Sequence, residues 1–297
     1  MDGARENDRR GKGKTSMILH QYHDVNRRGT IERLTYTARD QGGQTVTKYA
    51  NVYLPFGYTA EERYPVLYLI HGGGGNPDSW LDSTQIKNAL DYSFAGGRCR
   101  PFIAVFPGYY NHEPIRGGRV DEEAERGHVL FFQQELRNEL IPAVDQHYAT
   151  APAREARAIG GFSMGGVTTW FAFLENLDLF SVFMPLSGDC WQFGGLGGGK
   201  ETEKTVRYLQ EQVCKQGYGK DDFRIFAGSG LEDIAYPNLT PQIEGMKKLP
   251  NLFEYSENLD DGNLHYLVME NAPHMYEKVY HHVYHFLPVL FAKHTGE

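Results

Sequence analysis

Short apolar runs that alternate with longer amphipathic stretches constrain the fold of this 297-residue chain more than any other feature. The run at residues 65–70 (PVLYLI) is apolar throughout, as expected of a strand that is covered on both faces of a sheet. Comparable runs follow at residues 102–106, 156–162, 182–186, 223–227 and 264–269. Helices are predicted at residues 83–93, 129–146, 164–175, 201–216, 241–248 and 275–291. Strands that alternate with helices indicate βαβ units, so we expect an α/β fold with a mostly parallel central sheet and helices on both faces.

The segment before this alternation has the pattern of two strands that pair with each other. Residues 31–38 and 45–55 mix apolar and polar side chains, which favours an antiparallel hairpin at the start of the sheet. Residues 1–16 are polar and charged, and we expect them to form a flexible tail. Residues 17–297 are then expected to form a single domain.

The charge balance argues against two classes of partner. Lys and Arg number 30 and Asp and Glu 38, and a net charge of −8 does not suit binding to nucleic acid or to an anionic membrane. No stretch approaches the length of a membrane-spanning apolar segment, and the first residues lack the apolar core of a signal peptide. We therefore expect a cytoplasmic protein, or a secreted one if the chain is a trimmed or excised module. The cysteines Cys99, Cys190 and Cys214 are too few for a disulfide framework.

The strongest chemical signal is a G-x-S-x-G motif formed by Gly161-Phe162-Ser163-Met164-Gly165. It follows directly after an apolar strand and directly before a helix, which is the context of the nucleophile elbow in α/β hydrolases. Such a turn is sharp, and side chains at its glycine positions would collide with neighbouring backbone. The motif therefore predicts an α/β-hydrolase fold with Ser163 as a catalytic nucleophile.

A nucleophilic serine needs a histidine base, which in this fold follows the last strand. His274 lies in the loop after residues 264–269, whereas His265 lies inside that strand. His281, His282 and His285 fall on the last helix, and the helical period predicts that they point to solvent. Their spacing resembles a zinc-binding helix, but His282 stands where that motif needs Glu. We therefore expect His274 as the base, and neither a metal site nor a cofactor.

The acid that orients the base should follow the strand at residues 223–227. Glu232 and Asp233 both lie in the loop after that strand. Position alone does not separate them.

Acyl transfer also needs two N–H groups that stabilise the negative charge developing on the carbonyl oxygen. One is expected from Met164, the residue after the nucleophile. The other should come from the loop after the strand at residues 65–70, which reads His71-Gly72-Gly73-Gly74-Gly75. Glycine lets the backbone approach a substrate closely, and we expect Gly73 to supply this donor.

Residues 194–200 (GGLGGGK) interrupt the alternation and are expected to form a flexible loop that borders the site. They match part of a phosphate-binding P-loop. Glu201 stands where that motif needs Ser or Thr, so we do not expect a nucleotide site.

Taken together, VLYLIHGGGG, GGFSMGG, LSGDCW, GSGLEDIAYPN and APHMYEKVYHHVYHFLP resemble the esterase D-like family of α/β hydrolases. Within it, the chain looks most like feruloyl esterases of carbohydrate esterase family 1, over about residues 30–292. The resemblance implies a serine esterase that releases ferulic and related hydroxycinnamic acids from feruloylated plant cell-wall polysaccharide or oligosaccharide. It also implies Ser163, Asp233 and His274 as nucleophile, acid and base, which favours Asp233 over Glu232.

The same resemblance suggests that Trp191 lines an aromatic acyl pocket. Tyr109 and Tyr110 follow the strand at residues 102–106 and could reach the same cleft. The main alternative is an acetyl-xylan or general short-acyl esterase on the same scaffold. An S-formylglutathione hydrolase, an acyltransferase and a non-catalytic carbohydrate-binding descendant of the fold are less favoured.

Overall fold

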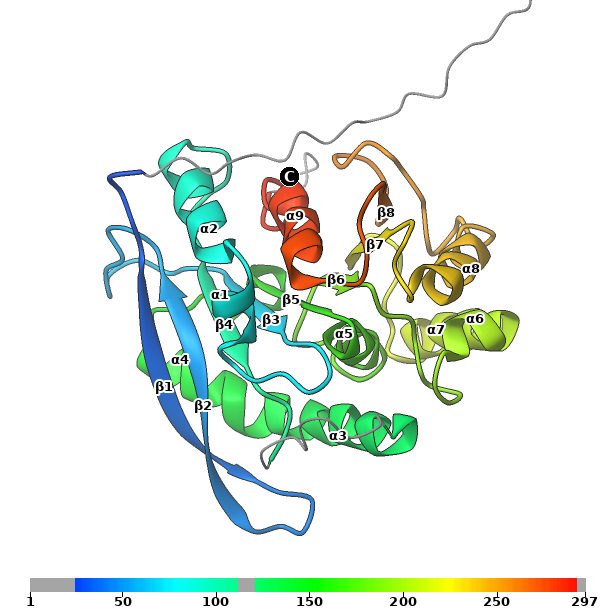
Figure 1. Cartoon of the computed structure of the whole chain (residues 1–297), viewed down its shortest axis with the longest axis horizontal. Coiled ribbons are helices and arrows are strands. Elements are labelled where there is room, and N and C mark those ends of the chain that lie inside the picture. The colour runs from blue at the N-terminus through cyan, green and yellow to red at the C-terminus, as the bar shows by residue number, and fades with distance from the viewer. Residues whose placement is uncertain (1–24, 112–120, 293–297) are drawn as a thin grey trace, which may run out of the picture.

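The computed structural model describes residues 25–111 and 121–292, so the expected tail at residues 1–16 lies outside the described part (Figure 1). One sheet runs through the described residues, with the strand order β1-β2-β4-β3-β5-β6-β7-β8. Its strands are β1 (Thr30–Arg39), β2 (Thr45–Leu54), β3 (Val66–Ile70), β4 (Ile103–Pro107), β5 (Arg157–Phe162), β6 (Val182–Leu186), β7 (Arg224–Gly230) and β8 (Leu264–Met269). β1 pairs antiparallel with β2 and β2 with β4, and the remaining pairs are parallel. The expected α/β architecture, with an antiparallel hairpin before a mostly parallel sheet, is confirmed.

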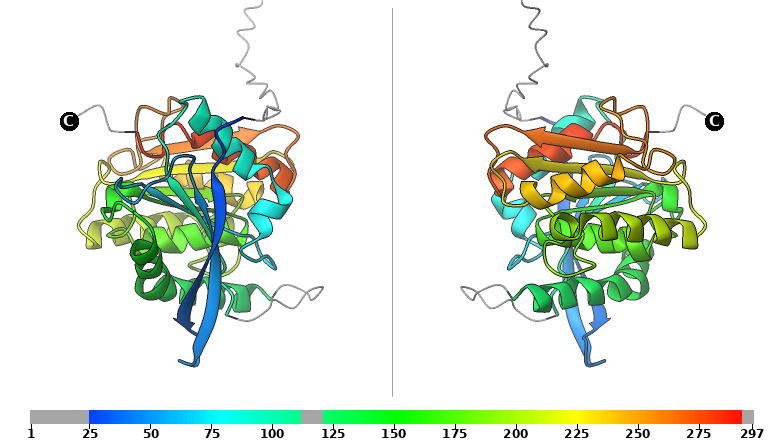
Figure 2. Two further views of the ribbon diagram at one scale, coloured as in Figure 1. Left: turned by 90° about the vertical axis from the view of Figure 1, so that its left-hand side faces the viewer. Right: turned by 90° about the vertical axis from the view of Figure 1, so that its right-hand side faces the viewer.

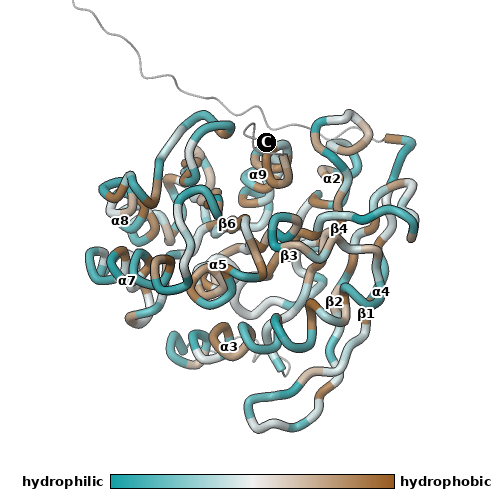
Figure 3. The backbone as a smooth tube through the Cα atoms, turned by 180° about the vertical axis from the view of Figure 1, so that it is seen from behind, coloured by the Kyte–Doolittle hydropathy of each residue, from teal (hydrophilic) through white to brown (hydrophobic). Residues whose placement is uncertain are grey.

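Helices cover both faces of the sheet, as the two edge views of Figure 2 show. They are α1 (Ser79–Ser83), α2 (Ile86–Ala95), α3 (Glu122–Glu135), α4 (Ile141–His147), α5 (Met164–Glu175), α6 (Gly197–Lys200), α7 (Thr202–Lys215), α8 (Tyr236–Met246) and α9 (Tyr276–Phe286), with a π-helical turn at Leu136–Leu140 between α3 and α4. Alternate residues of β3 face opposite cores: Tyr68 packs with α3 and α5, whereas Leu67 and Leu69 pack with α1, α2 and α9. Hydrophobic residues accordingly gather around β3, β4 and β6, and hydrophilic ones on α7 and α8 (Figure 3).

Several elements differ from the sequence prediction, among them the helix predicted at residues 129–146, which a π-helical turn divides, and the helix predicted to end at 291, which ends at Phe286. Helix α3, which was predicted to begin at residue 129, begins at Glu122. The side chain of Asp121 caps it by accepting from the N–H groups of Glu123 and Ala124. Helix α8 begins at Tyr236 rather than 241. Pro237 lies in its first turn, where the backbone N–H groups have no acceptor within the helix, so a proline is tolerated there. The expected flexible loop at residues 194–200 contains the short helix α6, and there the prediction was wrong.

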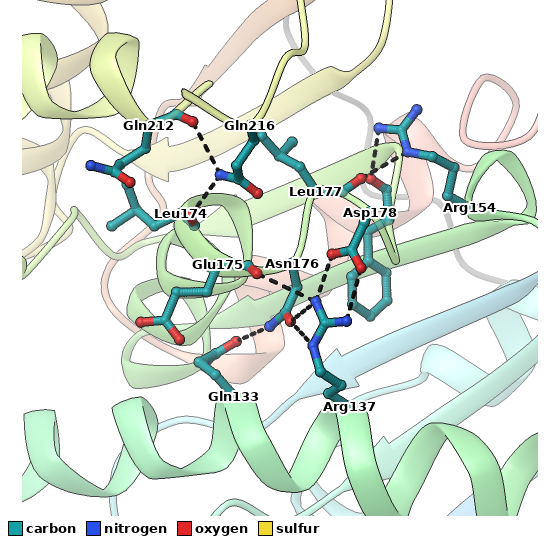
Figure 4. A network of polar contacts seen from close by, with 11 residues as sticks. Gln133, Arg137, Arg154, Leu174, Glu175, Asn176, Leu177, Asp178, Gln212 and Gln216 are labelled. Atoms are coloured by element: carbon teal, nitrogen blue, oxygen red, sulfur yellow. Dashed lines mark hydrogen bonds and ion pairs between the residues drawn. The ribbon is translucent and has the colours of Figure 1, made fainter. Parts of the chain in front are cut away.

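The end of α5 that lies away from Ser163 is held by a polar network (Figure 4). Arg137 donates from Nη2 to Oδ1 of Asn176, at 2.9 Å, and to Oδ1 of Asp178, at 2.6 Å. Nδ2 of Asn176 donates to Oε1 of Gln133 at 3.0 Å, and Nε2 of Gln216 to the carbonyl of Leu174 at 2.8 Å. These contacts join α5 to α3, the π-helical turn and α7, so the helix that begins at the candidate nucleophile is fixed at its other end.

The histidines of α9 do not form the expected solvated face. His281 and His282 are buried, and His285 is partly buried. His282 donates from Nε2 to the carbonyl of Ser229 at 3.1 Å, and a Cβ on Gly228 would lie 2.4 Å from its ring. The prediction was wrong because α9 contacts α1 and α2 as well as the sheet, so more than one of its faces is covered.

Metal-binding clusters and membrane-spanning helices are both absent from the described residues. They contain no group of three or more His, Cys, Asp or Glu side chains arranged to hold a metal ion. Over those same stretches, no helix combines the length and the apolar character that crossing a membrane requires.

Candidate active site

Ser163 stands on a sharp turn between β5 and α5. Its φ of 58° and ψ of −117° lie in a region that L residues rarely adopt, and such a conformation costs about 1–3 kcal/mol. The glycines of the motif make the turn possible: a Cβ on Gly161 would lie 2.7 Å, and one on Gly165 2.3 Å, from the carbonyl oxygen of Ile70 on β3. The elbow therefore depends on close backbone contact with the neighbouring strand.

Three predicted residues meet in one chain of hydrogen bonds. Nε2 of His274 lies 2.9 Å from Oγ of Ser163, and Nδ1 lies 2.7 Å from Oδ1 of Asp233. A carboxylate only accepts, so Nδ1 carries the proton, and Nε2 is free to accept from the serine hydroxyl. Ser163 follows β5, Asp233 follows β7 and His274 follows β8. The carboxyl ends of these strands meet at one edge of the parallel sheet.

The structure separates the two candidate acids. The carboxylate of Asp233 is buried, and its Oδ1 also accepts from the N–H of Ala235 at 2.7 Å. Glu232 is exposed, and its Oε2 accepts from the N–H of Ala272 at 2.9 Å. Asp233 therefore meets the base, whereas Glu232 links the loop after β7 to the loop that carries His274.

The glycine loop after β3 lies directly beside the nucleophile. A Cβ on Gly73 would lie 3.2 Å from Cγ of Met164, and one on Gly72 3.4 Å from Cβ of Ser163. Met164 is the first residue of α5, so its N–H has no acceptor within the helix. The two expected oxyanion donors are thus neighbours in space.

The buried side chain of His71 packs against this loop and is hydrogen-bonded to it. Its Nδ1 lies 2.8 Å from the carbonyl oxygen of Gly72, and its ring stacks on Tyr109 with the centroids 4.5 Å apart. Burial lowers the pKa of His71 to about 4, so the ring is neutral at ordinary pH. Tyr109 is itself 1% exposed and lies beneath the loop rather than in an open cleft.

Tyr110 and Trp191 both contact the first turns of α3, Tyr110 through Glu125 and Trp191 through Arg126, whose Nε donates to the carbonyl of Trp191 at 2.8 Å. The hydroxyl of Tyr110 donates to Glu125 on α3, at 2.7 Å, and accepts from the N–H of Gly74 at 2.9 Å. The indole N–H of Trp191 donates to Oδ1 of Asp189 at 3.2 Å. Trp191 is 8% exposed, so only a small part of its ring is open to a ligand.

Apolar side chains flank the acid and the base. Leu231 and Ile234 lie on either side of Asp233 along the chain, and Met275 follows His274. They are three of the four most exposed large apolar side chains in the described ranges 25–111 and 121–292. The loops after β7 and β8 therefore expose apolar side chains close in the chain to the acid and the base, alongside the exposed polar residues Glu232, Glu270 and Asn271.

Sequence reasoning missed three residues that touch this site. Asp189 holds Trp191, Glu125 holds Tyr110, and the hydroxyl of Tyr276 accepts from the N–H of Gly72 at 2.8 Å. Asp189 and Tyr276 stand within the LSGDCW and APHMYEKVYHHVYHFLP segments, but nothing in the sequence shows what they contact.

Comparison with known proteins connects this site to an enzyme family. A family model described as "Putative esterase" matches residues 47–295. The chain is 36% identical, over 89% of its length, to Endo-1,4-beta-xylanase Y of Acetivibrio thermocellus. It is 35% identical, over 56% of its length, to an Endo-1,4-beta-xylanase/feruloyl esterase of Xylanibacter ruminicola.

A solved structure agrees with these sequence matches. The feruloyl esterase module from Clostridium thermocellum, complexed with sinapinate, is 34% identical and superposes with a TM-score of 0.77. That match covers 91% of this chain and 90% of the module. The matched regions are only 23% and 22% of the two curated relatives, so the chain spans less than a quarter of their length.

Proposed function

Because the chain belongs to the esterase family, we propose that it is a serine carboxylic ester hydrolase that releases ferulic and related hydroxycinnamic acids through an acyl-enzyme. The support from the comparisons is that a module 34% identical over nine tenths of both chains is a feruloyl esterase. The observation that carries the mechanism is the continuous chain of hydrogen bonds from Ser163 through His274 to Asp233.

In the first half of the reaction, Oγ of Ser163 attacks the ester carbonyl while Nε2 of His274 takes the serine proton. Asp233 accepts from Nδ1 throughout and stabilises the imidazolium that forms. The N–H groups of Gly73 and Met164 donate to the oxygen that becomes negative. His274 then gives its proton to the departing alcohol, which leaves the acyl group on Ser163.

In the second half, water replaces the alcohol. His274 takes a proton from the water as it attacks the acyl-enzyme, and the same two N–H groups stabilise the second oxyanion. Collapse of this intermediate breaks the bond to Oγ, and His274 returns the proton to Ser163. The free carboxylic acid leaves and the enzyme is unchanged.

The aromatic acyl group is supported by the surroundings of the site. Trp191 lies after β6, between the strands that carry Ser163 and Asp233, and an aromatic ring packs well against an indole. The exposed Leu231, Ile234 and Met275, which lie within two residues of the acid or the base along the chain, are proposed to supply further apolar surface. The substrate is therefore proposed to be a small-molecule or oligosaccharide ester whose acid part is a phenolic ring.

Substrate preference tests this proposal. We expect kcat/KM on methyl ferulate to exceed that on p-nitrophenyl acetate, corrected for leaving-group reactivity, and on acetylated xylan. Trp191→Ala should lower kcat/KM on methyl ferulate by roughly ten-fold or more, because the contact and the burial of the ring are both lost. Trp191→Phe, which keeps an aromatic ring, should lose less.

The acetyl ester is the internal control. It lacks the ring, so its hydrolysis should change little in either variant. An equal loss on both substrates would mean that Trp191 supports the fold and not the acyl group. A preference of the wild type for acetylated xylan would favour the short-acyl esterase instead.

A further inference from the structure

The loop that carries the expected oxyanion donor is a run of four glycines, Gly72 to Gly75. Such a run has more backbone freedom than any other sequence, and Gly74 adopts a φ of +69°. An oxyanion donor is effective only when it is already in place as the charge develops. Something other than the loop itself must therefore hold it.

Two tyrosine hydroxyls hold the amides on either side of Gly73. The N–H of Gly72 donates to Tyr276 at 2.8 Å, and the N–H of Gly74 donates to Tyr110 at 2.9 Å. The N–H of Gly75 donates to the carbonyl of Gly72 at 3.1 Å. The N–H of Gly73 donates no hydrogen bond to another group within residues 25–111 and 121–292. In this arrangement the neighbouring amides are occupied, and the amide beside Met164 remains available.

The direction of the hydrogen bond at Tyr110 is fixed by a carboxylate. The hydroxyl lies 2.7 and 2.8 Å from the two oxygens of Glu125, which can only accept from it. Its proton is thus turned to Glu125, and a lone pair remains for the N–H of Gly74. Burial raises the pKa of Tyr110 to about 12, so the hydroxyl keeps its proton at neutral pH.

Tyr276 is held by its ring. The ring lies 4.8 Å from that of Phe162 and 5.3 Å, edge to face, from that of Trp80. The indole N–H of Trp80 donates to the carbonyl of Ile70 at 2.9 Å, so this cluster is anchored to β3. Tyr276 is also the first residue of α9, which follows the loop of His274. It therefore links the base to the glycine loop.

We propose, on the basis of the proposed ester hydrolysis, that Tyr110 and Tyr276 are positioning residues that preform the oxyanion hole by fixing the Gly73 amide beside Met164. Both hydroxyls bind amides of the glycine loop, and neither takes part in the proposed reaction. Their loss should let the glycine loop rotate, which weakens binding of the tetrahedral, negatively charged state. Binding of the planar ester should change much less, because the neutral carbonyl gains little from the donor.

The test removes each hydroxyl and keeps the ring. Tyr276→Phe and Tyr110→Phe should each lower kcat on p-nitrophenyl acetate by about 10- to 100-fold, less than the 10²–10³ typical of deleting a donor. KM should stay within about three-fold, since ground-state binding is not affected. The Ki of a phenylboronic acid, which adds to the serine and becomes tetrahedral, should rise in parallel with the fall in kcat.

Tyr58→Phe is the matched control. Its hydroxyl accepts from the N–H of Ala149 at 2.8 Å, so it loses the same kind of hydrogen bond away from the site. Its kcat and boronate Ki should equal those of the wild type. A thermal unfolding curve of each variant separates loss of the fold from loss of positioning, and the two tyrosines come from different elements, so either variant alone tests the idea.

The outcomes are distinct. If wild type is active and both variants behave like Tyr58→Phe, the positioning role is wrong and the proposed hydrolysis stands. A rise in KM with unchanged kcat would also overturn it, because it would mean that the hydroxyls bind the ground state. Absence of hydrolysis of any ester by the wild type would overturn the proposed function, and this inference with it.

Discussion

Lowering the pH from 7 to 5 is expected to remove much of the free energy of unfolding, because His71, His265 and His282 are buried as neutral rings. Each is 1% exposed. Burial lowers the pKa of each ring to about 4, whereas an imidazole in the unfolded chain titrates near 6.5.

Burial explains why these rings resist protonation, and their hydrogen bonds to backbone carbonyls oppose it only in part, because a carbonyl acceptor raises the pKa of each ring. Each uses one ring nitrogen on a backbone carbonyl: His71 on Gly72 at 2.8 Å, His265 on Ser256 at 3.0 Å and His282 on Ser229 at 3.1 Å. Nε2 of His71 and of His265 is buried and has no partner among the described residues. A proton added there would bury a charge and a donor that nothing accepts.

The sign and size of the effect follow from proton linkage. Between pH 6.5 and 4 the unfolded chain binds more protons than the folded one, so stability rises with pH in this window. The contribution is fully present above pH 6.5 and is lost as the pH falls toward 4. At pH 5 each histidine costs about 2 kcal/mol, and three cost about 6 kcal/mol out of a typical 5–15.

Urea unfolding at pH 7, 6 and 5 measures this directly. His265→Asn and His282→Gln each keep a side-chain N–H close to the one that the histidine donates, and each should flatten the dependence of unfolding free energy on pH by up to one proton. Tyr58→Phe, which removes a hydrogen bond to the N–H of Ala149 but no histidine, is the control for a general loss of stability. A wild type equally stable at pH 7 and 5, or variants with the wild-type dependence, would refute the reasoning.

Three further predictions concern activity. Ser163→Ala should lower kcat by about 10⁴- to 10⁶-fold with an unchanged unfolding curve, and more than a tenth of the activity remaining would exclude it as the nucleophile. Asp233→Asn should cost about 10²- to 10⁴-fold and Glu232→Gln less than about three-fold, since glutamine keeps an acceptor; the reverse ranking would move the acid by one residue. Asp189→Asn leaves one acceptor oxygen for two donors, the indole N–H of Trp191 and the N–H of Gly198. Because Trp191 is then less well held, kcat/KM on methyl ferulate should fall by about ten-fold. An equal fall on p-nitrophenyl acetate would show that Asp189 does not act by positioning Trp191.

The strands could be predicted because they are buried on both faces. The apolar runs predicted at residues 65–70 and 182–186 coincide with β3 and β6 to within one residue, since no solvent-facing position interrupts them. The helices were less certain at their ends, because caps such as Asp121 lie outside the periodic pattern. The burial of His282 could not be predicted, since a helical period assigns one buried face, and only the fold shows that Gly228 makes room for a ring on another.

The candidate site divides in the same way. Ser163 and His274 could be located because an elbow and a loop after the last strand are local features that the order of elements fixes. The residues alone left Asp233 and Glu232 open, because the two differ in the direction of a side chain and not in position. Direction depends on Ala272 and His274, which lie about forty residues further along the chain.

The hydrogen bonds from the glycine loop to the hydroxyls of Tyr110 and Tyr276 could not be predicted from the sequence. A run of glycines has a flexible backbone, and it has no side chains whose type would indicate what they contact. Its geometry is therefore decided entirely by groups from elsewhere, here Tyr110 from the loop after β4 and Tyr276 from α9. Tyr276 lies 204 residues from the amide it accepts from, and a tyrosine near the start of a helix is by itself ordinary. Sequence thus indicates candidates for the groups that carry the chemistry, whereas the residues that contact these candidates are shown only by the fold.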